Sequence, residues 1–120
     1  MIYIASPYSD PDVEVRNKRT LEVTKYAGFL HGRGDIAISP IVYGHALVRV
    51  TPTLGEDIYS WERFCKALLS KCTSIDLLML EGWKDSLGIK MELEKAKALG
   101  MCVRFIRPED YLIKDDRCVE

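Results

Sequence analysis

The sequence has few cysteines, no concentrated basic block and no long apolar run, and each absence excludes a class of protein. Its four cysteines form no C-x-x-C pair, which argues against a finger-type metal site or a disulfide scaffold and favours reduced, buried thiols. The near balance of 17 basic and 18 acidic residues argues against a nucleic-acid polymer as partner. No apolar run approaches the roughly 18 residues of a membrane span. A small molecule is therefore the expected partner.

The first residues and the motif content add two further expectations. Met1–Pro7 has no basic region and no long apolar core, so we expect no signal peptide and a cytoplasmic protein. No metal or organic cofactor is expected. A chain of 120 residues with 48% hydrophobic and 29% charged side chains can fill and cover one core. We therefore expect a single domain over residues 1–120, with a polar tail from about residue 108.

Hydrophobic periodicity predicts alternating strands and helices. Short apolar runs ended by turn residues predict strands at Ile2–Ala5, Asp35–Ser39, Ile75–Leu80 and Met101–Ile106. Apolar residues spaced three and four apart predict helices at about Val13–Leu30, Asp57–Cys72 and Ser86–Leu99. The stretch Ile41–Gly55 is expected to be irregular, with one helical turn around His45–Val48.

This alternation is typical of an α/β fold with right-handed crossovers. We expect a three-layer, flavodoxin-like or Rossmann-like parallel sheet of about four strands, with helices on both faces. In such sheets the ligand site lies at the carboxyl ends of the strands. Ser6, Ser39 and Ser86 lie in turns that follow predicted strands, so the site is expected there.

Glu92 has an unusual position for a surface carboxylate. At about 100° per residue, Ile89, Leu93 and Ala96 form the buried stripe of the last helix, and Glu92 lies about 60° from its centre. The position is also near the helix N-terminus, which points toward the strand ends. A partly buried carboxylate there is expected to have an altered pKa and to act as nucleophile or base. The alternative is an edge glutamate paired with a neighbouring cation.

The start of the same helix is a candidate anion site. Ser86 is a candidate N-cap, Gly88 permits close approach of a ligand to the backbone, and free N–H groups favour an anion. An ordinary helix start has the same features, so both interpretations stay open.

The first strand and its loop form a second candidate cluster. Tyr3 alternates with apolar residues and is either a core residue or part of the site. The candidate substrate-binding residues of the loop are Ser6, Pro7, Tyr8 and Ser9. Arg16, on the inward side of the following helix, needs an anionic partner, which is either a substrate phosphate or a structural carboxylate.

Other candidates carry weaker signals. His45 is a candidate substrate contact or a structural histidine, and Glu62, at the edge of an apolar stripe, is a candidate acid or a surface ion-pair partner. Asp76 is interpreted as a cap or pairing residue. Trp61 and Trp83 are core or rim aromatics, either of which would suit stacking on a base.

Two motifs give the sequence a familiar pattern. Ile2-Tyr3-Ile4-Ala5-Ser6-Pro7-Tyr8 is followed by Gly82-Trp83-x-x-Ser86-x-Gly88-x-x-x-Glu92. Over nearly its whole length the chain resembles the nucleoside 2-deoxyribosyltransferase family, which includes nucleotide N-glycosidases. The resemblance implies that Glu92 attacks the anomeric carbon to form a glycosyl-enzyme ester, that Tyr3 hydrogen-bonds this carboxylate, and that water or an acceptor base releases the sugar.

The resemblance also bears on the substrate. The monophosphate-cleaving relatives have Ser at the position of Ser86, where the transferases have Asp. Together with Ser6, Ser9 and Arg16, this favours a nucleoside 5′-monophosphate. The second catalytic carboxylate of the family has no match, and its place falls near Cys65.

Glu62 is the first candidate to replace that carboxylate as general acid, ahead of His45 and Asp76. We therefore expect an N-glycosidase or deoxyribosyltransferase that acts on nucleosides or their 5′-monophosphates. The alternative is a nucleotide sensor with the same pocket and no chemistry; a flavodoxin-like structural subunit is a third possibility that leaves Glu92 unexplained. The resemblance further implies a homodimer or larger homo-oligomer.

Overall fold

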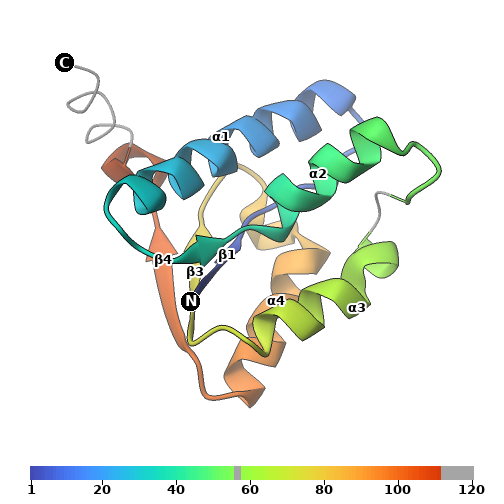
Figure 1. Cartoon of the computed structure of the whole chain (residues 1–120). Helices are drawn as coiled ribbons and strands as arrows, with labels where there is room; N and C mark the ends of the chain where they lie inside the picture. Colours follow the sequence, from blue (N-terminus) through green and yellow to red (C-terminus); the bar gives the residue numbers. More distant parts are fainter. Residues whose placement is uncertain (56–57, 112–120) are drawn as a thin grey trace.

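A computed structural model describes residues 1–55 and 58–111 and confirms the predicted fold class (Figure 1). Its four strands form one parallel sheet in the order β2-β1-β3-β4. The strands are β1 (Ile2–Ala5), β2 (Ala37–Ile38), β3 (Ser74–Leu78) and β4 (Cys102–Ile106). The helices are α1 (Val13–Gly32), α2 (Pro40–Val50), α3 (Ile58–Leu69) and α4 (Leu87–Ala98), with a 3₁₀ turn, η1, at Trp83–Asp85.

Successive strand residues point to opposite sides of the sheet, and helices cover both faces. Ile4 points to the α1 face, where the core cluster comprises Ile4, Val23, Tyr26, Leu30, Leu78, Leu80 and Tyr111. Tyr3 points to the other face, where the cluster comprises Tyr3, Ala5, Leu69, Cys72, Ile75 and Ala96, with α3 and α4 as the covering helices. Figure 1 shows α1 and α3 on opposite sides of the strands.

The stretch Ile41–Gly55 was expected to be irregular. This prediction was wrong, because most of the stretch is helix α2. Ser39 is the N-cap, with its hydroxyl accepting a hydrogen bond from Val42 N at 3.2 Å, and Pro40 occupies the first turn. A serine followed by proline is a favourable helix start as well as a strand end. The sequence interpretation used only the second meaning.

The other element boundaries differ from expectation by a few residues. β2 is shorter than Asp35–Ser39, and α3 ends at Leu69 rather than Cys72. The predicted start of that helix, Asp57, lies outside the described residues. Ser86 is the N-cap of α4, as expected, and its hydroxyl accepts a hydrogen bond from Ile89 N at 3.2 Å.

The predicted polar tail also needs correction at its first residues. Residues 108–111 are helical, and Tyr111 is only 1% exposed within the α1-side core. Its hydroxyl donates to the carbonyl oxygen of Glu22 at 3.3 Å. Residues 112–120, including Cys118, lie outside the described part.

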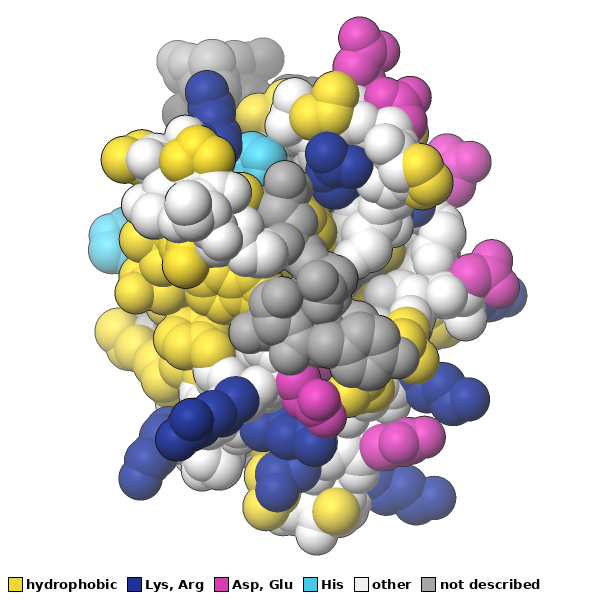
Figure 2. All heavy atoms as spheres, turned by 90° about the vertical axis from the view of Figure 1, so that its right-hand side faces the viewer, with side chains coloured by type: hydrophobic (Ala, Val, Ile, Leu, Met, Phe, Trp, Pro, Cys, Tyr) yellow, Lys and Arg dark blue, Asp and Glu magenta, His cyan; other side chains and the backbone are white. Residues whose placement is uncertain are grey.

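The three cysteine thiols within residues 1–111 are free, as expected, but not all are buried. Cys72 is buried and Cys65 half-buried, whereas Cys102 is exposed on β4. Figure 2 shows basic and acidic side chains together on one face of the molecule, with hydrophobic side chains gathered beside them. Within the described residues, no helix has the length and apolar character needed to cross a membrane.

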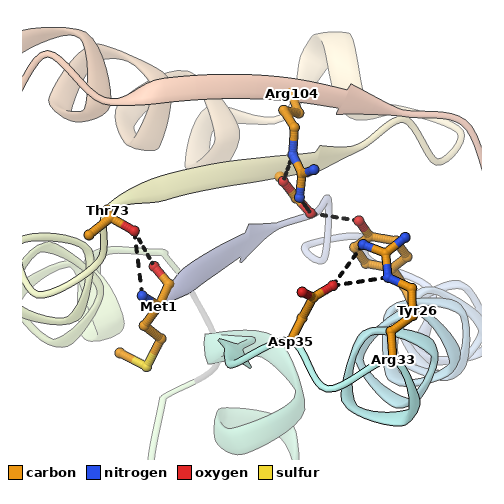
Figure 3. Close-up of polar contacts among 7 residues, drawn as sticks. Met1, Tyr26, Arg33, Asp35, Thr73 and Arg104 are labelled. Atoms are coloured by element: carbon orange, nitrogen blue, oxygen red, sulfur yellow. Dashed lines mark hydrogen bonds and ion pairs between the residues drawn. The ribbon is translucent and has the colours of Figure 1, made fainter.

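Asp76, a candidate acid from the sequence, is a structural residue of β3 whose side chain lies on the α1 side of the sheet, and Figure 3 shows its partners Tyr26 and Arg104. It is fully buried, and it accepts hydrogen bonds from the Tyr26 hydroxyl at 2.6 Å and from Arg104 Nε and Nη2 at 2.8 Å each. Tyr26 belongs to α1 and Arg104 to β4, so Asp76 ties the edge strand and α1 to β3. This interaction lies on the sheet face opposite Tyr3.

Candidate active site

A cavity of about 390 Å³ lies at the carboxyl edge of the sheet. The chain passes from β1 outward to β2 and then returns to β3 on the other side of β1, so the carboxyl ends of β1 and β3 flank the topological switch point. The cavity draws its walls from the β1 loop, α2, α3 and the start of α4. Its lining residues are Ser6, Tyr8, Ser9, Pro40, Ile41, Gly44, His45, Val48, Trp61, Cys65, Asp85, Ser86, Leu87, Gly88 and Glu92.

Glu92 forms part of the cavity wall and is held from behind by Tyr3. The Tyr3 side chain is fully buried, and its hydroxyl donates a hydrogen bond to Glu92 Oε2. The Cys65 thiol of α3 lies beside the same hydroxyl. Strand β1 and helices α3 and α4 thus bring Tyr3, Cys65 and Glu92 together, because α3 and α4 pack against each other over the sheet face to which Tyr3 points.

Burial raises the pKa of all three groups. Burial raises the pKa of the Glu92 carboxyl to about 8, although the Tyr3 hydrogen bond lowers it in part. Burial, and then the charge of Glu92, raises the pKa of the Cys65 thiol to about 11. The same two causes raise the pKa of Tyr3 far above its ordinary value, so Tyr3 remains a hydrogen-bond donor.

The start of α4 presents polar groups to the same cavity. Leu87 and Gly88 are the first two residues of α4, so their N–H groups have no acceptor within the helix, and they lie beside Ser86. Across from them, Ser6 is 5% exposed, and its Oγ has no hydrogen-bond partner among the described residues. A buried, unsatisfied hydroxyl in a cavity wall is a ready hydrogen-bond partner for a ligand.

Arg19 holds the β1 loop against the end of β3. Its Nη1 donates to the carbonyl oxygen of Ser9 at 2.9 Å, and its Nη2 donates to that of Glu81 at 3.2 Å. Gly82 has a φ of 89°, and a Cβ there would lie 2.5 Å from Arg19 Nη2. The glycine that opens the second motif therefore permits this clamp.

The opposite half of the cavity is largely apolar. Ile41 and Val48 of α2 face Trp61 of α3, whose ring lies 3.6 Å from the position a Cβ on Gly44 would occupy. His45 lines this half, and its Nδ1 is hydrogen-bonded with the Tyr8 hydroxyl at 3.0 Å. The two rings meet edge to face at 5.8 Å between centroids.

The structure brings most of the predicted site residues to this cavity. Those that line it are Ser6, Tyr8, Ser9, His45, Ser86, Gly88 and Glu92, with Tyr3 directly behind Glu92. Three predicted residues are not among the described lining. Pro7 is fully buried, Arg16 donates to the carbonyl oxygen of Asp10, and Glu62 forms an ion pair with Lys66 at 2.7 Å.

Glu62 nevertheless lies near Glu92, on the far side of it from the cavity. It lines a separate narrow space of about 10 Å³ between α3 and α4, together with Cys65 and Glu92. This space is too small for any substrate group.

Several lining residues were not identified as site residues from the sequence. Asp85 lies directly before Ser86 and inside the second motif, so its proximity to the site could have been inferred. Trp61 and Trp83 were both considered as core or rim aromatics that would suit stacking on a base, and of the two Trp61 lines the cavity. Trp83 packs against Phe105 at 5.9 Å on the β4 side. The apolar wall from α2 was missed because that helix itself was missed.

Among the described residues, no group of three or more His, Cys, Asp or Glu side chains is placed to hold a metal ion. The polar groups of the cavity are instead hydroxyls, backbone amides, the His45 imidazole, the Cys65 thiol and the carboxyls of Asp85 and Glu92. These are suited to hydrogen bonding with an organic ligand.

Comparison with known proteins gives a family for the chain but no activity. The family described as a domain of unknown function, DUF1937, matches residues 1–107. A search of curated proteins found no match. The matched segment includes every element that lines the cavity, from β1 through α4. The chain therefore belongs to the DUF1937 family.

Proposed function

We propose that the protein cleaves the N-glycosidic bond of a nucleoside or nucleoside 5′-monophosphate, with Glu92 as the nucleophile. The observation that carries the proposal is the Glu92 carboxyl, which lies in the wall of a cavity at the switch point and is hydrogen-bonded by Tyr3. The resemblance to nucleoside 2-deoxyribosyltransferases assigns the same roles to these two residues. The cavity of about 390 Å³ is in the range that encloses small organic ligands.

In the first step a Glu92 oxygen forms a bond to the anomeric carbon while the bond from that carbon to the base nitrogen breaks. The electron pair of the broken bond stays with the base. In the second step water, or another base, attacks the same carbon and releases the Glu92 carboxylate, so the sugar configuration is retained. Tyr3 hydrogen-bonds the carboxylate form and thereby favours the attacking species.

The experiment that tests this function is a base-release assay. The protein is incubated with a panel of nucleosides and nucleoside 5′-monophosphates, and free base is measured by chromatography. We expect release from at least one substrate and none with Glu92→Gln. A panel without base release would contradict the proposal.

Replacing Tyr3 by phenylalanine is expected to move the acidic limb of kcat/KM to higher pH. Ionised Glu92 attacks, so activity rises as pH passes the Glu92 pKa of about 8. A hydrogen bond to a charged group contributes about 1.5–3 kcal/mol, and one pK unit corresponds to about 1.4 kcal/mol. Losing the Tyr3 hydroxyl should therefore move the limb up by about one to two units and lower the rate at neutral pH about 10- to 100-fold. A limb that stays in place or moves to lower pH would show that Tyr3 does not stabilise the carboxylate.

A 5′-monophosphate is expected to bind through Ser6, Ser86 and the first amides of α4. Ser6→Ala should weaken monophosphate binding about tenfold, since a charge-assisted hydrogen bond contributes about 1.5–3 kcal/mol. The fold should be unaffected, because the lost hydroxyl has no partner among the described residues. Arg16→Ala, outside the described cavity lining, is the matched control. Calorimetry that shows unchanged affinity in Ser6→Ala, or equal affinity of wild type for nucleoside and monophosphate, would contradict this assignment.

A nucleotide sensor with the same pocket is the second candidate function. It is favoured by Cys65, which takes the place of the second family carboxylate, and by the raised pKa of Glu92, which leaves little carboxylate at neutral pH. A sensor would bind a monophosphate by calorimetry and release no base.

We further propose that the protein works in the cytoplasm as a homodimer or larger homo-oligomer, as the resemblance implies.

A further inference from the structure

The cavity has two chemically different halves, and they orient a nucleoside. The half formed by the β1 loop and the start of α4 carries Ser6 and Ser86, which suit the hydroxyls or phosphate of a sugar, and Asp85, which suits a sugar hydroxyl. The half formed by α2 and α3 carries Ile41, Val48 and Trp61, which suit a flat base. With the anomeric carbon at Glu92, between the halves, the base departs toward α2.

A departing purine or pyrimidine takes up the electron pair of the broken bond, and proton transfer to it contributes typically 10²–10⁴-fold in rate. Two of the candidate proton donors lie outside the cavity. Asp76 lies on the opposite face of the sheet with Tyr26 and Arg104. Glu62 is ion-paired to Lys66 and faces the narrow space behind Glu92.

Two further acidic groups line the cavity itself but are poorly suited. Asp85 lies at the sugar half, next to Ser86. The Cys65 thiol has its pKa raised to about 11 and lies within reach of the Tyr3 hydroxyl that holds the nucleophile. Among the described lining residues of the base half, His45 is the remaining side chain with a readily transferred proton.

His45 is also held in position. It lies one turn into α2, whose start is fixed by the Ser39 cap and by Pro40. Its Nδ1 is hydrogen-bonded with the Tyr8 hydroxyl at 3.0 Å, and the edge-to-face contact of the rings restricts its rotation. Tyr8 is therefore a positioning residue for the imidazole.

We propose that His45 is the general acid that protonates the departing base, an inference that rests on the proposed glycosidase function. As the bond between the anomeric carbon and the base nitrogen breaks, the imidazolium form of His45 gives an N–H proton to a ring nitrogen of the base and becomes neutral imidazole. The imidazole then takes a proton from the water that attacks the glycosyl-Glu92 ester. One proton is thus given and one recovered in each cycle, and the base leaves neutral.

The test compares two substrates that differ in their need for a proton. 2′-Deoxyguanosine requires protonation of its leaving base, whereas the cationic 7-methyl-2′-deoxyguanosine releases a neutral base without it. The variants are His45→Gln and, as matched control, Glu62→Gln. We expect His45→Gln to lower kcat/KM on 2′-deoxyguanosine by about 100-fold or more and on the 7-methyl substrate by less than about fivefold. Glu62→Gln should retain activity on both.

The other outcomes decide against the assignment. Equal losses on both substrates in His45→Gln would make His45 a binding residue, and a selective loss in Glu62→Gln would make Glu62 the acid. Turnover of the 7-methyl substrate also shows that the variant is folded. If wild type cleaves both substrates and Glu92→Gln cleaves neither, the proposed function holds even if His45 fails. If wild type releases base from neither of these substrates nor from any other member of the panel, the proposed function fails and the His45 assignment fails with it.

Discussion

Glu92→Gln is expected to lower base release at least about 1000-fold, because glutamine cannot form the glycosyl ester and a lost nucleophile removes about 4 kcal/mol or more of transition-state stabilisation. Glutamine has nearly the same shape and can still accept the hydrogen bond of Tyr3, so ligand binding should persist. The measurement is kcat/KM on the best substrate of the panel, with affinity by calorimetry. Retention of more than about a tenth of the wild-type rate would remove Glu92 from the mechanism.

The same variant has an expected effect on stability, which serves as its folding control. Burial raises the Glu92 pKa from 4.5 to about 8, so the unfolded chain loses this proton at lower pH than the folded protein. The contribution of the protonated carboxyl is fully present below pH 4.5 and is lost as pH rises through about 8. Glutamine does not ionise, so Glu92→Gln should unfold at a temperature no lower than wild type near pH 8. A strongly lowered unfolding temperature would mean that the activity loss reflects misfolding.

Asp76→Ala is expected to lower the free energy of unfolding by about 3 kcal/mol, since removing one partner of a buried ion pair costs about 3–5 kcal/mol and Arg104 can turn to solvent. The carboxylate is fully buried, whereas the Arg104 side chain is 47% exposed. The substitution also leaves the buried Tyr26 hydroxyl without its acceptor.

Asp35→Ala is the matched control for this prediction. Its carboxylate pairs with Arg33 at 2.7 Å (Figure 3), but the Arg33 and Asp35 side chains are 45% and 35% exposed, so the loss of this pair should cost about 0–1 kcal/mol. Urea unfolding of both variants measures the difference. Equal destabilisation would show that the Asp76 interactions contribute no more than a surface pair.

The sequence predicted the sheet, three of the four helices and the nucleophile candidate, because each depends on local periodicity. Glu92 departs from the polar side of an otherwise regular helix, and its helix has a serine cap and a closing glycine. The contact between Tyr3 and Glu92 was predicted from the motif resemblance alone. Their contact depends on α4 packing over the sheet face to which Tyr3 points, which periodicity does not determine.

What the sequence did not provide depends on tertiary contacts or on signals with two meanings. Ser39-Pro40 ends a strand and also starts a helix. Because helix α2 was not predicted, the apolar half of the cavity was not predicted either. Arg16 was expected to meet a phosphate, but its guanidinium reaches the carbonyl of Asp10. Tyr111 lies in a polar segment by composition, yet it is buried because the chain turns back over α1 after β4.

The most direct test of Glu92 as the nucleophile is mass spectrometry of the protein after incubation with a 2′-deoxy-2′-fluoroarabinosyl nucleoside of the preferred base. Fluorine beside the anomeric carbon slows both steps, and the good leaving base lets the glycosyl ester accumulate. We expect wild type to gain the mass of the fluorinated sugar, with the added mass on the peptide that contains Glu92, and Glu92→Gln to remain unmodified. Base release with no adduct, or an adduct on another residue, would contradict a covalent mechanism through Glu92.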